Sequence, residues 1–406
     1  MLNVVILNGG RGAAALIPVL LDRHGLSVTS VVNAYDDGKS TGTIRQFFGM
    51  LGPSDIRKVQ ELMLPPDDPD HAANLNIFRF RFAEGMAYEH AVSHLQDFAT
   101  GRSDELTGSR FTSAKVRSSL RAFVREFLDG MLAIETARGE RFDFSDCSIM
   151  NCLYAGAFLV FNRNIEDATR FIDRLFKLRG TVLPTSIEDK QLVALRENGQ
   201  MLYCEAEIVE LRSNVRIDRI YLLDKPLDRA RFEQLSLEEK RYYLEKHHCY
   251  VGVSSGVRLA LQQADIIIYS AGTQHSSLYP TYLSAGLAES IADNKSALKV
   301  FITNIGADYE TPSYKASDYV KGAYRYLNLS DDRDYDMQEL MDVLLINQSH
   351  HKSDETYVEL DEEGFKEVPV RRVIDEFESQ HAPGKHNGPK VVQTIVELYE
   401  ASTALE

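Results

Sequence analysis

The sequence predicts an α/β fold: a Rossmann-like, mostly parallel sheet with helices on both faces, a helical insertion and a small antiparallel β segment. Two apolar runs rich in β-branched residues, at 2–7 and 27–34, predict buried strands. A helical pattern follows each run, and strands that alternate with helices form parallel sheets. A change to helical patterning alone after residue 60 predicts the insertion.

Composition and charge indicate a soluble globular protein. The chain has 406 residues, of which 44% are hydrophobic and 26% charged, as in ordinary globular domains. Its formal net charge of −15 argues against non-specific binding to nucleic acid or to membranes. The cysteines lack Cys-x-x-Cys spacing, and the sequence shows no secretory signal or membrane span. We therefore expect a cytoplasmic protein with no nucleic-acid or membrane partner.

We expect three regions along the chain. Residues 1–60 and 143–347 are predicted to form the Rossmann-like nucleotide-binding core, which includes the antiparallel β segment at about 180–224. Residues 61–142 are predicted to form the helical insertion, a cap near the site. Residues 348–406 are predicted to form a C-terminal extension that ends in a closing helix. We expect the protein to be a homodimer.

Further elements follow from local patterns. Short runs that alternate apolar and polar residues predict the antiparallel segment, and they lie at 182–187, 190–196, 201–209 and 215–222. Continuous apolar runs predict buried core strands, and these lie at 265–269, 297–303 and 342–347, the last being the final strand. The charged stretch 348–367 predicts a solvated loop or an edge hairpin. A helix is predicted to begin at Ala13.

Glycine residues follow the first strand directly. Gly9, Gly10 and Gly12 surround Arg11 and precede the predicted helix. The N–H groups of such a turn, the helix dipole and the absence of side chains together favour a bound phosphate. The Arg11 guanidinium can offer paired donors to two phosphate oxygens. The alternative is a strand-to-helix turn that uses glycine for its geometry alone.

Two further loops carry charged residues typical of phosphate chemistry. The second strand runs into Asp36-Asp37-Gly38-Lys39-Ser40-Thr41-Gly42, and a later helix start carries Asp55 and Arg57. An acid at the tip of a second strand binds a ribose hydroxyl in dinucleotide folds, but paired acids followed by Lys and Ser favour a phosphate or metal site. A P-loop is excluded because Asn33 stands where that motif needs glycine.

Two later loops are rich in hydroxyl and amide groups that could bind phosphate oxygens. Each follows a predicted strand, and their relevant residues are Gly272, Ser276, Ser277, Tyr279 and Asn304. Because the carboxyl ends of parallel strands meet at one edge of a sheet, we expect all these loops to lie together.

One further motif has two interpretations. The segment Gly252-Val253-Ser254-Ser255-Gly256 fits the G-x-S-x-G pattern of serine hydrolases, in which the nucleophile stands between a strand and a helix. The residues before it form a poor core strand. We interpret Ser254 and Ser255 instead as N-caps of a helix at 257–263.

Six segments, in this order along the chain, resemble the CofD/YvcK family. They are Asn8-Gly9-Gly10-Arg11-Gly12, Asp36-Asp37-Gly38-Lys39-Ser40-Thr41-Gly42, Gly52-Pro53-Ser54-Asp55-Ile56-Arg57, Arg179-Gly180 with Val182-Leu183-Pro184, Gly272 with Ser276-Ser277-Leu278-Tyr279, and Asn304 with Glu310-Thr311. The resemblance implies a Rossmann-like core that binds a nucleotide-diphosphate conjugate. CofD-type members move a phospholactyl group from a guanosine diphosphate conjugate to a deazaflavin alcohol, using magnesium. YvcK-type members bind UDP-sugars and are linked to cell-wall and carbon regulation, and the sequence is more similar to these.

The chain also departs from the family pattern. Arg11 replaces a threonine and Lys39 replaces a glycine, and both changes add positive charge beside the expected phosphates. The family's His-Ser-x-Gly-Asn is here Cys147-Ser148-Ile149-Met150-Asn151, which retains Asn151.

Three functions are compatible with these residues. The first is a CofD-like transferase that binds a nucleotide-diphosphate conjugate, of the NDP-sugar or NDP-acyl type, and transfers its phospho-linked group with Mg²⁺. The second is a non-catalytic, YvcK-like regulatory protein that binds a UDP-sugar. The third is a serine hydrolase that uses Ser254.

The predicted site residues have distinct roles under the first function. The predicted catalytic residues are Asp36, Asp37, Asp55 and Arg57, and the three acids are also the predicted Mg²⁺ ligands. Helix N-capping is the alternative role for these acids. The predicted nucleotide- or phosphate-binding residues are Gly9, Gly10, Arg11, Gly12, Gly38, Lys39, Ser40, Thr41, Asn151, Gly272, Ser276, Ser277, Tyr279 and Asn304. Arg11, Lys39 and Arg57 are predicted to neutralise the diphosphate.

Overall fold

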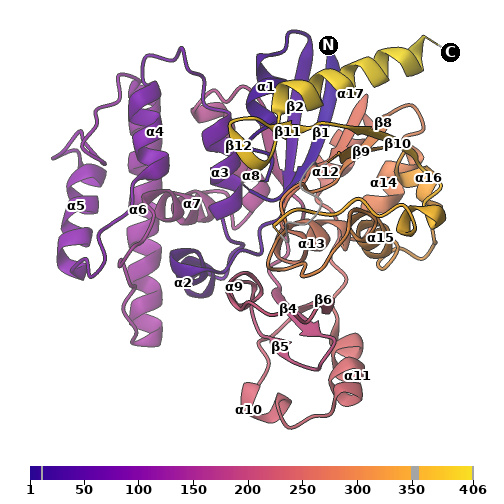
Figure 1. Ribbon diagram of the computed structural model, residues 1–406. Helices are drawn as coiled ribbons and strands as arrows, with labels where there is room; N and C mark the ends of the chain where they lie inside the picture. The colour runs from indigo at the N-terminus through magenta and orange to yellow at the C-terminus, as the bar shows by residue number, and fades with distance from the viewer. Residues whose placement is uncertain (11, 349–355, 405–406) are drawn as a thin grey trace.

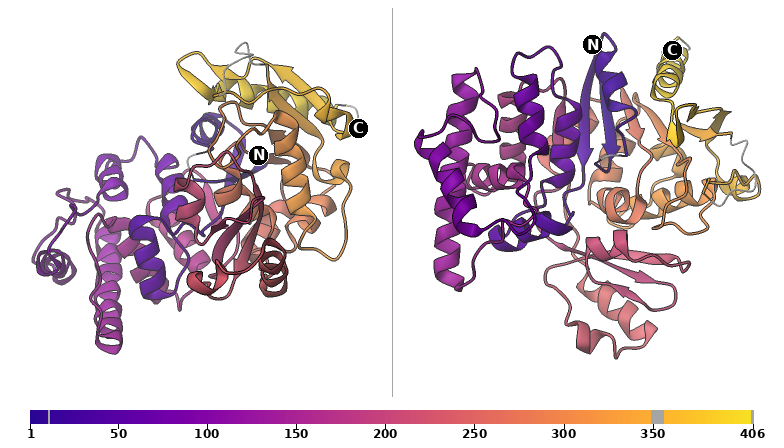
Figure 2. Two further views of the ribbon diagram at one scale, coloured as in Figure 1. Left: turned by 60° about the horizontal axis from the view of Figure 1, so that its bottom comes forward. Right: turned by 60° about the vertical axis from the view of Figure 1, so that its left-hand side comes forward.

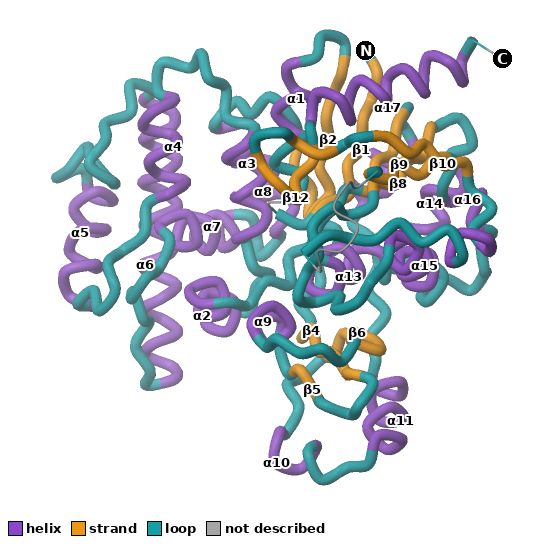
Figure 3. The backbone as a smooth tube through the Cα atoms, in the orientation of Figure 1, coloured by secondary structure: helices purple, strands orange, loops and turns teal. Residues whose placement is uncertain are grey.

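A seven-stranded parallel sheet lies at the centre of the computed structural model, which describes residues 1–10, 12–348 and 356–404. The strand order is β10-β9-β8-β7-β1-β2-β3, and every pair of neighbours is parallel. The strands are β1 (Leu2–Asn8), β2 (Leu26–Val32), β3 (Thr181–Pro184), β7 (Ile266–Tyr269), β8 (Leu298–Ile302), β9 (Val343–Asn347) and β10 (Arg371–Asp375). Helices flank this sheet (Figures 1 and 3), so the predicted fold class is confirmed.

The helices that pack around the sheet come from most of the chain. They are α1 (Ile17–Asp22), α2 (Lys39–Phe48), α3 (Ser54–Leu62), α8 (Ile165–Leu175), α12 (Ser255–Gln262), α13 (Tyr279–Tyr282), α14 (Leu287–Asp293), α15 (Ala316–Leu327), α16 (Met337–Leu340) and α17 (Gly388–Thr403). The closing helix α17 lies beside α1, where a side chain at Gly388 would meet the carbonyl of Ala15. Both chain ends therefore lie at the same end of the sheet (Figure 1).

A helical region lies at one side of the sheet, on the left in Figure 1. It contains α4 (His71–Arg79), α5 (Tyr88–Thr100), α6 (Ala114–Arg138) and α7 (Ile149–Val160). The predicted amphipathic helix is α6, which buries an apolar stripe against α7. The two helices approach closely because Gly156 has no side chain: an added Cβ would lie 1.9 Å from the Phe123 carbonyl oxygen. Of the helices in the described ranges, none is both long and apolar enough to cross a membrane.

A small lobe projects from the opposite end of the sheet to α17, at the bottom of Figure 1 and of the right-hand view in Figure 2. Its antiparallel strands have the order β5-β4-β6. The elements of the lobe are β4 (Gln191–Arg196), β5 (Met201–Leu202), α9 (Glu205–Glu210), β6 (Ile217–Leu223), α10 (Arg229–Phe232) and α11 (Leu237–His247). The lobe has its own apolar cluster, which includes Val193, Tyr221 and Leu244.

Two runs that were predicted as antiparallel strands have other structures. The run at 182–187 belongs to β3, which pairs in parallel with β2 at the edge of the main sheet. Val182 and Leu183 are both buried, and this continuous burial is typical of a parallel strand. The run at 201–209 is a strand only at Met201–Leu202 and then becomes α9. A carboxylate from a distant loop caps that helix, which local patterning cannot reveal.

The C-terminal part of the sheet also differs from the prediction. The strand at 342–347 is present as β9, but it is not the last, because β10 pairs with its outer edge. Most of β10 is exposed, so its sequence lacks the apolar run of a core strand. Beyond it lie a short hairpin of β11 (Glu378–Ser379) and β12 (Ala382–His386). Of the charged stretch 348–367, residues 349–355 lie outside the described ranges, and a 3-10 turn follows at Gly364–Glu367.

The first helix begins later than predicted. Residues 13–16 form turns, with the N–H groups of Leu16 and Ile17 both bonded to the Ala13 carbonyl, and α1 starts at Ile17. Pro18 occupies the first turn of α1, a position that suits its fixed φ and missing N–H. The glycine turn is therefore separated from the helix N-terminus by four residues.

Candidate functional site

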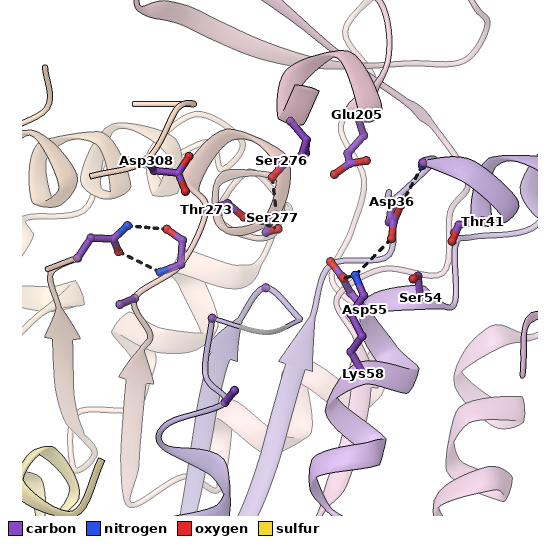
Figure 4. Close-up of a pocket in the computed structure, with 18 of the residues that line it drawn as sticks. Asp36, Thr41, Ser54, Asp55, Lys58, Glu205, Thr273, Ser276, Ser277 and Asp308 are labelled. Carbon is purple, nitrogen blue, oxygen red and sulfur yellow. Dashed lines mark hydrogen bonds and ion pairs between the residues drawn. The ribbon is translucent and has the colours of Figure 1, made fainter. Parts of the chain in front are cut away.

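A polar cavity of about 1160 Å³ opens at the carboxyl ends of the central strands. The chain runs from β1 outward to β2 and β3 on one side and returns through β7 to β10 on the other. The switch point of this doubly wound sheet therefore lies between β1 and β7, where ligands of such folds bind. The loops after β1, β2, β7 and β8 all line the cavity, as do the first turns of α3 and α9 (Figure 4).

The glycine turn after β1 lies against the loop that follows β7. An added Cβ at Gly9 would lie 2.2 Å from Ser277 Cβ, and one at Gly12 would lie 2.6 Å from the Ala271 carbonyl oxygen. Gly10 has a φ of +49°, which favours glycine. The predicted phosphate ligand Arg11 lies outside the described residues. The glycines thus serve close packing of two loops as well as access to the cavity.

Side chains from the β7 and β8 loops hold one wall of the cavity in place. In the π-helical turn η1 (Gln274–Leu278), Ser276 and Ser277 line the cavity, and the Thr273 hydroxyl lies 2.9 Å from Ser277 Oγ. The buried Glu310 carboxyl accepts from the Ser276 hydroxyl and from the Ser276 N–H, and burial raises its pKa to about 8. Asn304 pairs through its amide with the backbone N–H and carbonyl of Gly272, at 3.0 Å each.

The acidic side of the cavity consists of Asp36, Asp55 and Glu205, and Lys58 is the cation that forms ion pairs with the two aspartates. The Lys58 ammonium lies 2.7 Å from Asp55 Oδ1 and 3.8 Å from Asp36 Oδ2, so it bridges the two aspartates (Figure 4). Burial raises the pKa of Asp55, and the charge of Asp36 raises it further, although Lys58 opposes both effects. Asp36 and Asp55 thus share one ion-paired cation, and the charge of Arg57 also acts on Asp55.

The adjacent Asp37 points elsewhere. Its carboxylate accepts the N–H groups of Glu205 and Ala206 at 3.3 and 2.9 Å, in the first turn of α9. It therefore caps a helix of the small lobe and does not line the cavity. Glu205 does line it, and burial together with the charges of Asp36 and Asp55 raises the pKa of Glu205 to about 9.

The acidic side offers carboxylate oxygens of the kind that bind Mg²⁺. In the described part of the chain, no group of three or more His, Cys, Asp or Glu residues could hold a metal ion. Mg²⁺ in phosphate-transfer sites, however, commonly uses only one or two carboxylates, with waters and substrate phosphates as its other ligands. Asp36 and Asp55 fit that pattern, since both lie within ion-pair distance of one cation, the Lys58 ammonium.

The basic side of the cavity consists of Lys39, Arg57 and Arg81 with a single carboxylate, Asp146. Arg81 Nε donates to Asp146 Oδ1 at 2.6 Å, and Lys39 Nζ lies 3.7 Å from Asp146 Oδ2. The Arg81 guanidinium also donates to Ser40 Oγ at 3.2 Å. Arg57 is mostly buried, and its guanidinium donates to the Phe78 carbonyl. All four charged residues line the cavity.

Three predicted ligands are placed away from the cavity lining. Tyr279 is fully buried, and its ring stacks on Tyr326 at a centroid distance of 4.3 Å. Asn151 is also fully buried and lies behind Ser40, to which its amide donates at 3.3 Å. Gly10 is the third. The remaining predicted residues within the described ranges line the cavity, with the exception of Asp37, and these are Gly9, Gly12, Asp36, Gly38, Lys39, Ser40, Thr41, Asp55, Arg57, Gly272, Ser276, Ser277 and Asn304.

The helix-capping interpretation of Ser254 is confirmed. Ser254 is buried, its Oγ accepts the N–H of Val257 in the first turn of α12, and it is not part of the cavity lining.

The cavity also contains charged residues that sequence reasoning missed. They are Lys58, Arg81, Asp146, Glu205, Glu210, Asp308 and Lys385. Lys58 had a local signal, because it stands three residues after Asp55 and so shares its helix face. Asp308 belongs to the loop after β8, whose Asn304 was among the predicted ligands. The others come from segments that carry no motif, and only the tertiary fold brings them to the cavity.

The fold and this cavity define a Rossmann-like α/β protein with a polar site at the switch point of its sheet. The model of the family described as 2-phospho-L-lactate transferase CofD matches residues 4–378. The chain therefore belongs to this family.

Curated relatives and a solved structure are similar to the chain over nearly its whole length. The chain is 23% identical over 410 residues to the gluconeogenesis factor of Listeria monocytogenes, covering 99% of this chain and 97% of that protein. It is 24% identical over 400 residues to the gluconeogenesis factor of Halalkalibacterium halodurans, covering 97% and 96%. The crystal structure of protein BH3568 from Bacillus halodurans is similar with a TM-score of 0.65 at 21% identity, over 97% of this chain and 99% of that one. This structural likeness concerns the fold.

Proposed function

We propose that the protein is a CofD-like transferase, which binds a nucleotide-diphosphate conjugate and transfers its phospho-linked group with Mg²⁺. The observation that carries the proposal is the joint presence, in one cavity at the switch point, of the glycine turn and the Asp36–Asp55 pair. The turn offers backbone N–H groups and close access to phosphate oxygens. The paired acids offer the hard oxygen ligands that Mg²⁺ prefers.

The loops divide the proposed roles between them. Gly9, Gly12 and Ser277, which meet where the β1 and β7 loops touch, would contact the diphosphate. Asp36 and Asp55 would hold Mg²⁺ in place of the Lys58 ammonium. When bound, Mg²⁺ would neutralise phosphate oxygens and so favour displacement at phosphorus.

The proposed transfer balances as a displacement at phosphorus. An acceptor hydroxyl oxygen forms a bond to the phosphorus remote from the nucleoside, and the anhydride P–O bond breaks. The nucleoside monophosphate leaves with the bridging oxygen, and the hydroxyl proton passes to water. Positioning and charge neutralisation supply most of the rate in such reactions.

A turnover assay tests the proposal. The protein is incubated with UDP-, GDP- and CDP-conjugates and Mg²⁺, with and without a panel of small alcohols, and release of the nucleoside monophosphate is followed. We expect release with one base class, abolished by chelation of Mg²⁺. Tight binding of a conjugate without any release would contradict the transferase.

A non-catalytic regulatory protein that binds a UDP-sugar is the second candidate. The full-length similarity to proteins named gluconeogenesis factor favours it. It predicts saturable binding of a UDP-sugar in calorimetric titration together with no release of UMP, whatever alcohol is added. The same assay therefore separates the two candidates.

A further inference from the structure

The basic side of the cavity has more positive charge than its own carboxylate can balance. Lys39 and Arg81 share one acid, Asp146, and Arg57 lies near enough to Arg81 for their charges to interact. That acid pairs with Arg81 and Lys39 but not with Arg57, which has no ion pair with any other residue in the described ranges. Burial lowers the pKa of Arg57 and the nearby charge of Arg81 lowers it further, whereas the charges of Glu61, Asp36 and Asp55 oppose these effects. Two like charges held together in this way favour an added anion.

The surrounding backbone favours an anion as well. Ser40, which Arg81 and Asn151 both contact, lies in the first turn of the ten-residue helix α2. No side chain among the described residues caps that turn, so its N–H groups and the helix dipole attract negative charge. Arg57 provides an independent observation, because this nine-tenths buried side chain lines the same cavity and its Nε has no hydrogen-bond partner among the described residues.

We propose that Lys39, Arg57 and Arg81 form a second anion subsite, distinct from the glycine turn, for an oxyanion group of the ligand or co-substrate. A phosphate or a carboxylate fits, since an arginine guanidinium can present paired donors to either. The subsite deepens the proposed function and rests on it for the identity of the group: the oxyanion is carried by the transferred part of the conjugate or by the separate acceptor.

Asp146 is the internal stand-in for this oxyanion. Its carboxylate accepts from Arg81 and pairs with Lys39, and these contacts hold its pKa below the ordinary value. The residue also has a φ of +48°, an uncommon conformation for a residue with a side chain. A ligand oxyanion would compete with Asp146 for Arg81, and removing the Asp146 charge should therefore strengthen anion binding.

A phosphorus NMR titration with inorganic phosphate tests the subsite. We expect Arg81→Gln to weaken phosphate binding by at least tenfold, because a charge-assisted contact is lost, and Arg81→Lys to recover part of the loss. Asp146→Asn should tighten binding several-fold, and asparagine tolerates a positive φ, so the loop should keep its shape. Arg79→Gln is the matched control: Arg79 is an exposed arginine two residues away that pairs with Glu61 outside the cavity lining.

The outcomes that overturn the subsite are clear. Phosphate that does not bind the wild type, that binds Arg81→Gln as well as the wild type, or that responds equally to Arg79→Gln would each refute it. Weaker binding to Asp146→Asn would refute the stand-in role.

Competition then identifies the source of the oxyanion. Phosphate at a second subsite should remain bound when UDP or GDP saturates the protein, and its displacement by either would refute a separate subsite. If UDP-glucuronate, which carries a carboxylate on its sugar, displaces phosphate where UDP does not, the oxyanion belongs to the transferred group. If phosphate stays bound, the subsite serves the acceptor. Failure of every nucleotide to bind would refute the proposed function while the Arg81-dependent phosphate binding still stood.

Discussion

The acidic and basic sides of the cavity carry opposite charge but share one arrangement, in which one group of the opposite sign lies among several like charges. On the acidic side a single ammonium, Lys58, lies among carboxylates, and on the basic side a single carboxylate, Asp146, lies among cations. Lys58 lies where a ligand cation would bind, and Asp146 lies where a ligand anion would bind. Under the proposed function, a cation and an anion would enter together, as a metal–phosphate complex does, and each side alone would retain its ligand less strongly.

The largest effect on activity is expected from loss of an acid on the acidic side. Asp55→Asn removes one of two carboxylates from the proposed Mg²⁺ site, and we expect a loss of turnover of at least about a hundredfold, which corresponds to about 2.7 kcal/mol. The stability of the ligand-free protein should not fall, because burial raises the pKa of this carboxyl and makes its charged form costly.

Steady-state rates over a range of Mg²⁺ concentrations, together with urea unfolding, measure both effects. Glu61→Gln, on the same helix but outside the cavity lining, is the control and should change neither. Equal loss in both variants would show that the helix, not the carboxylate, was perturbed.

The next prediction concerns the pH dependence of stability on the acidic side. The pKa of Glu205 rises from an ordinary 4.5 to about 9 on folding, so between these values the folded protein holds a proton that the unfolded chain has released. The free energy of unfolding should therefore fall as pH rises, by at most about 1.4 kcal/mol per pH unit from this group. In Glu205→Gln this contribution is absent.

Urea unfolding of both proteins in metal-free buffer, from about pH 5 to about pH 9, measures the difference. The free energy of unfolding of Glu205→Gln, relative to that of the wild type, should increase toward pH 9. Parallel curves would mean that Glu205 ionises normally.

The third prediction distinguishes the roles of the two adjacent aspartates. Asp36 belongs to the acidic side, whereas Asp37 caps α9 of the small lobe through two N–H groups. Asp37→Ala should therefore lower the free energy of unfolding by about 0.5–2 kcal/mol, the usual cost of a lost N-cap. Asp37→Asn, which keeps a side-chain acceptor, should lose less. Urea midpoints of the two variants decide between capping and a role confined to the ligand.

Much of the fold could be predicted from sequence, because a strand that is buried on both faces of a sheet consists largely of apolar residues. The runs that became β1, β7 and β8 are mostly apolar and buried, and β2 ends in a buried apolar pair. The failures have the opposite character. Most of β10 is exposed and so carries no apolar run, and α9 owes its first turn to Asp37, which stands about 170 residues earlier in the sequence.

The candidate site was predictable where one loop carries several polar residues, as at 36–41. The sequence could not show that neighbouring residues of this loop point in different directions. Asp36 faces Lys58, Asp37 caps α9, and Lys39 faces Asp146. Neither could the sequence find Arg81, Asp146 or Glu205, since each comes alone from a distant segment. Backbone direction decides where a side chain in a tight loop points, and residue type does not record it.

The smallest effect on stability is expected at Lys39, whose backbone conformation directs its side chain toward Asp146. Lys39 has a φ of +47°, a conformation that costs a side-chain-bearing residue about 1–2 kcal/mol. Its pairing with Asp146 offsets little of this, because the lysine side chain is 74% exposed. Lys39→Gly should relieve the strain but increase the entropy of the unfolded chain, so we expect a net change in stability of about 0.5 kcal/mol or less. Phosphate affinity should nevertheless fall by a few-fold, because one cation leaves the basic side. Urea unfolding and the phosphate titration, run on the same samples, measure the pair. A stabilised variant with unchanged phosphate affinity would show that the lysine does not serve the anion, and the basic side would then rest on the two arginines alone.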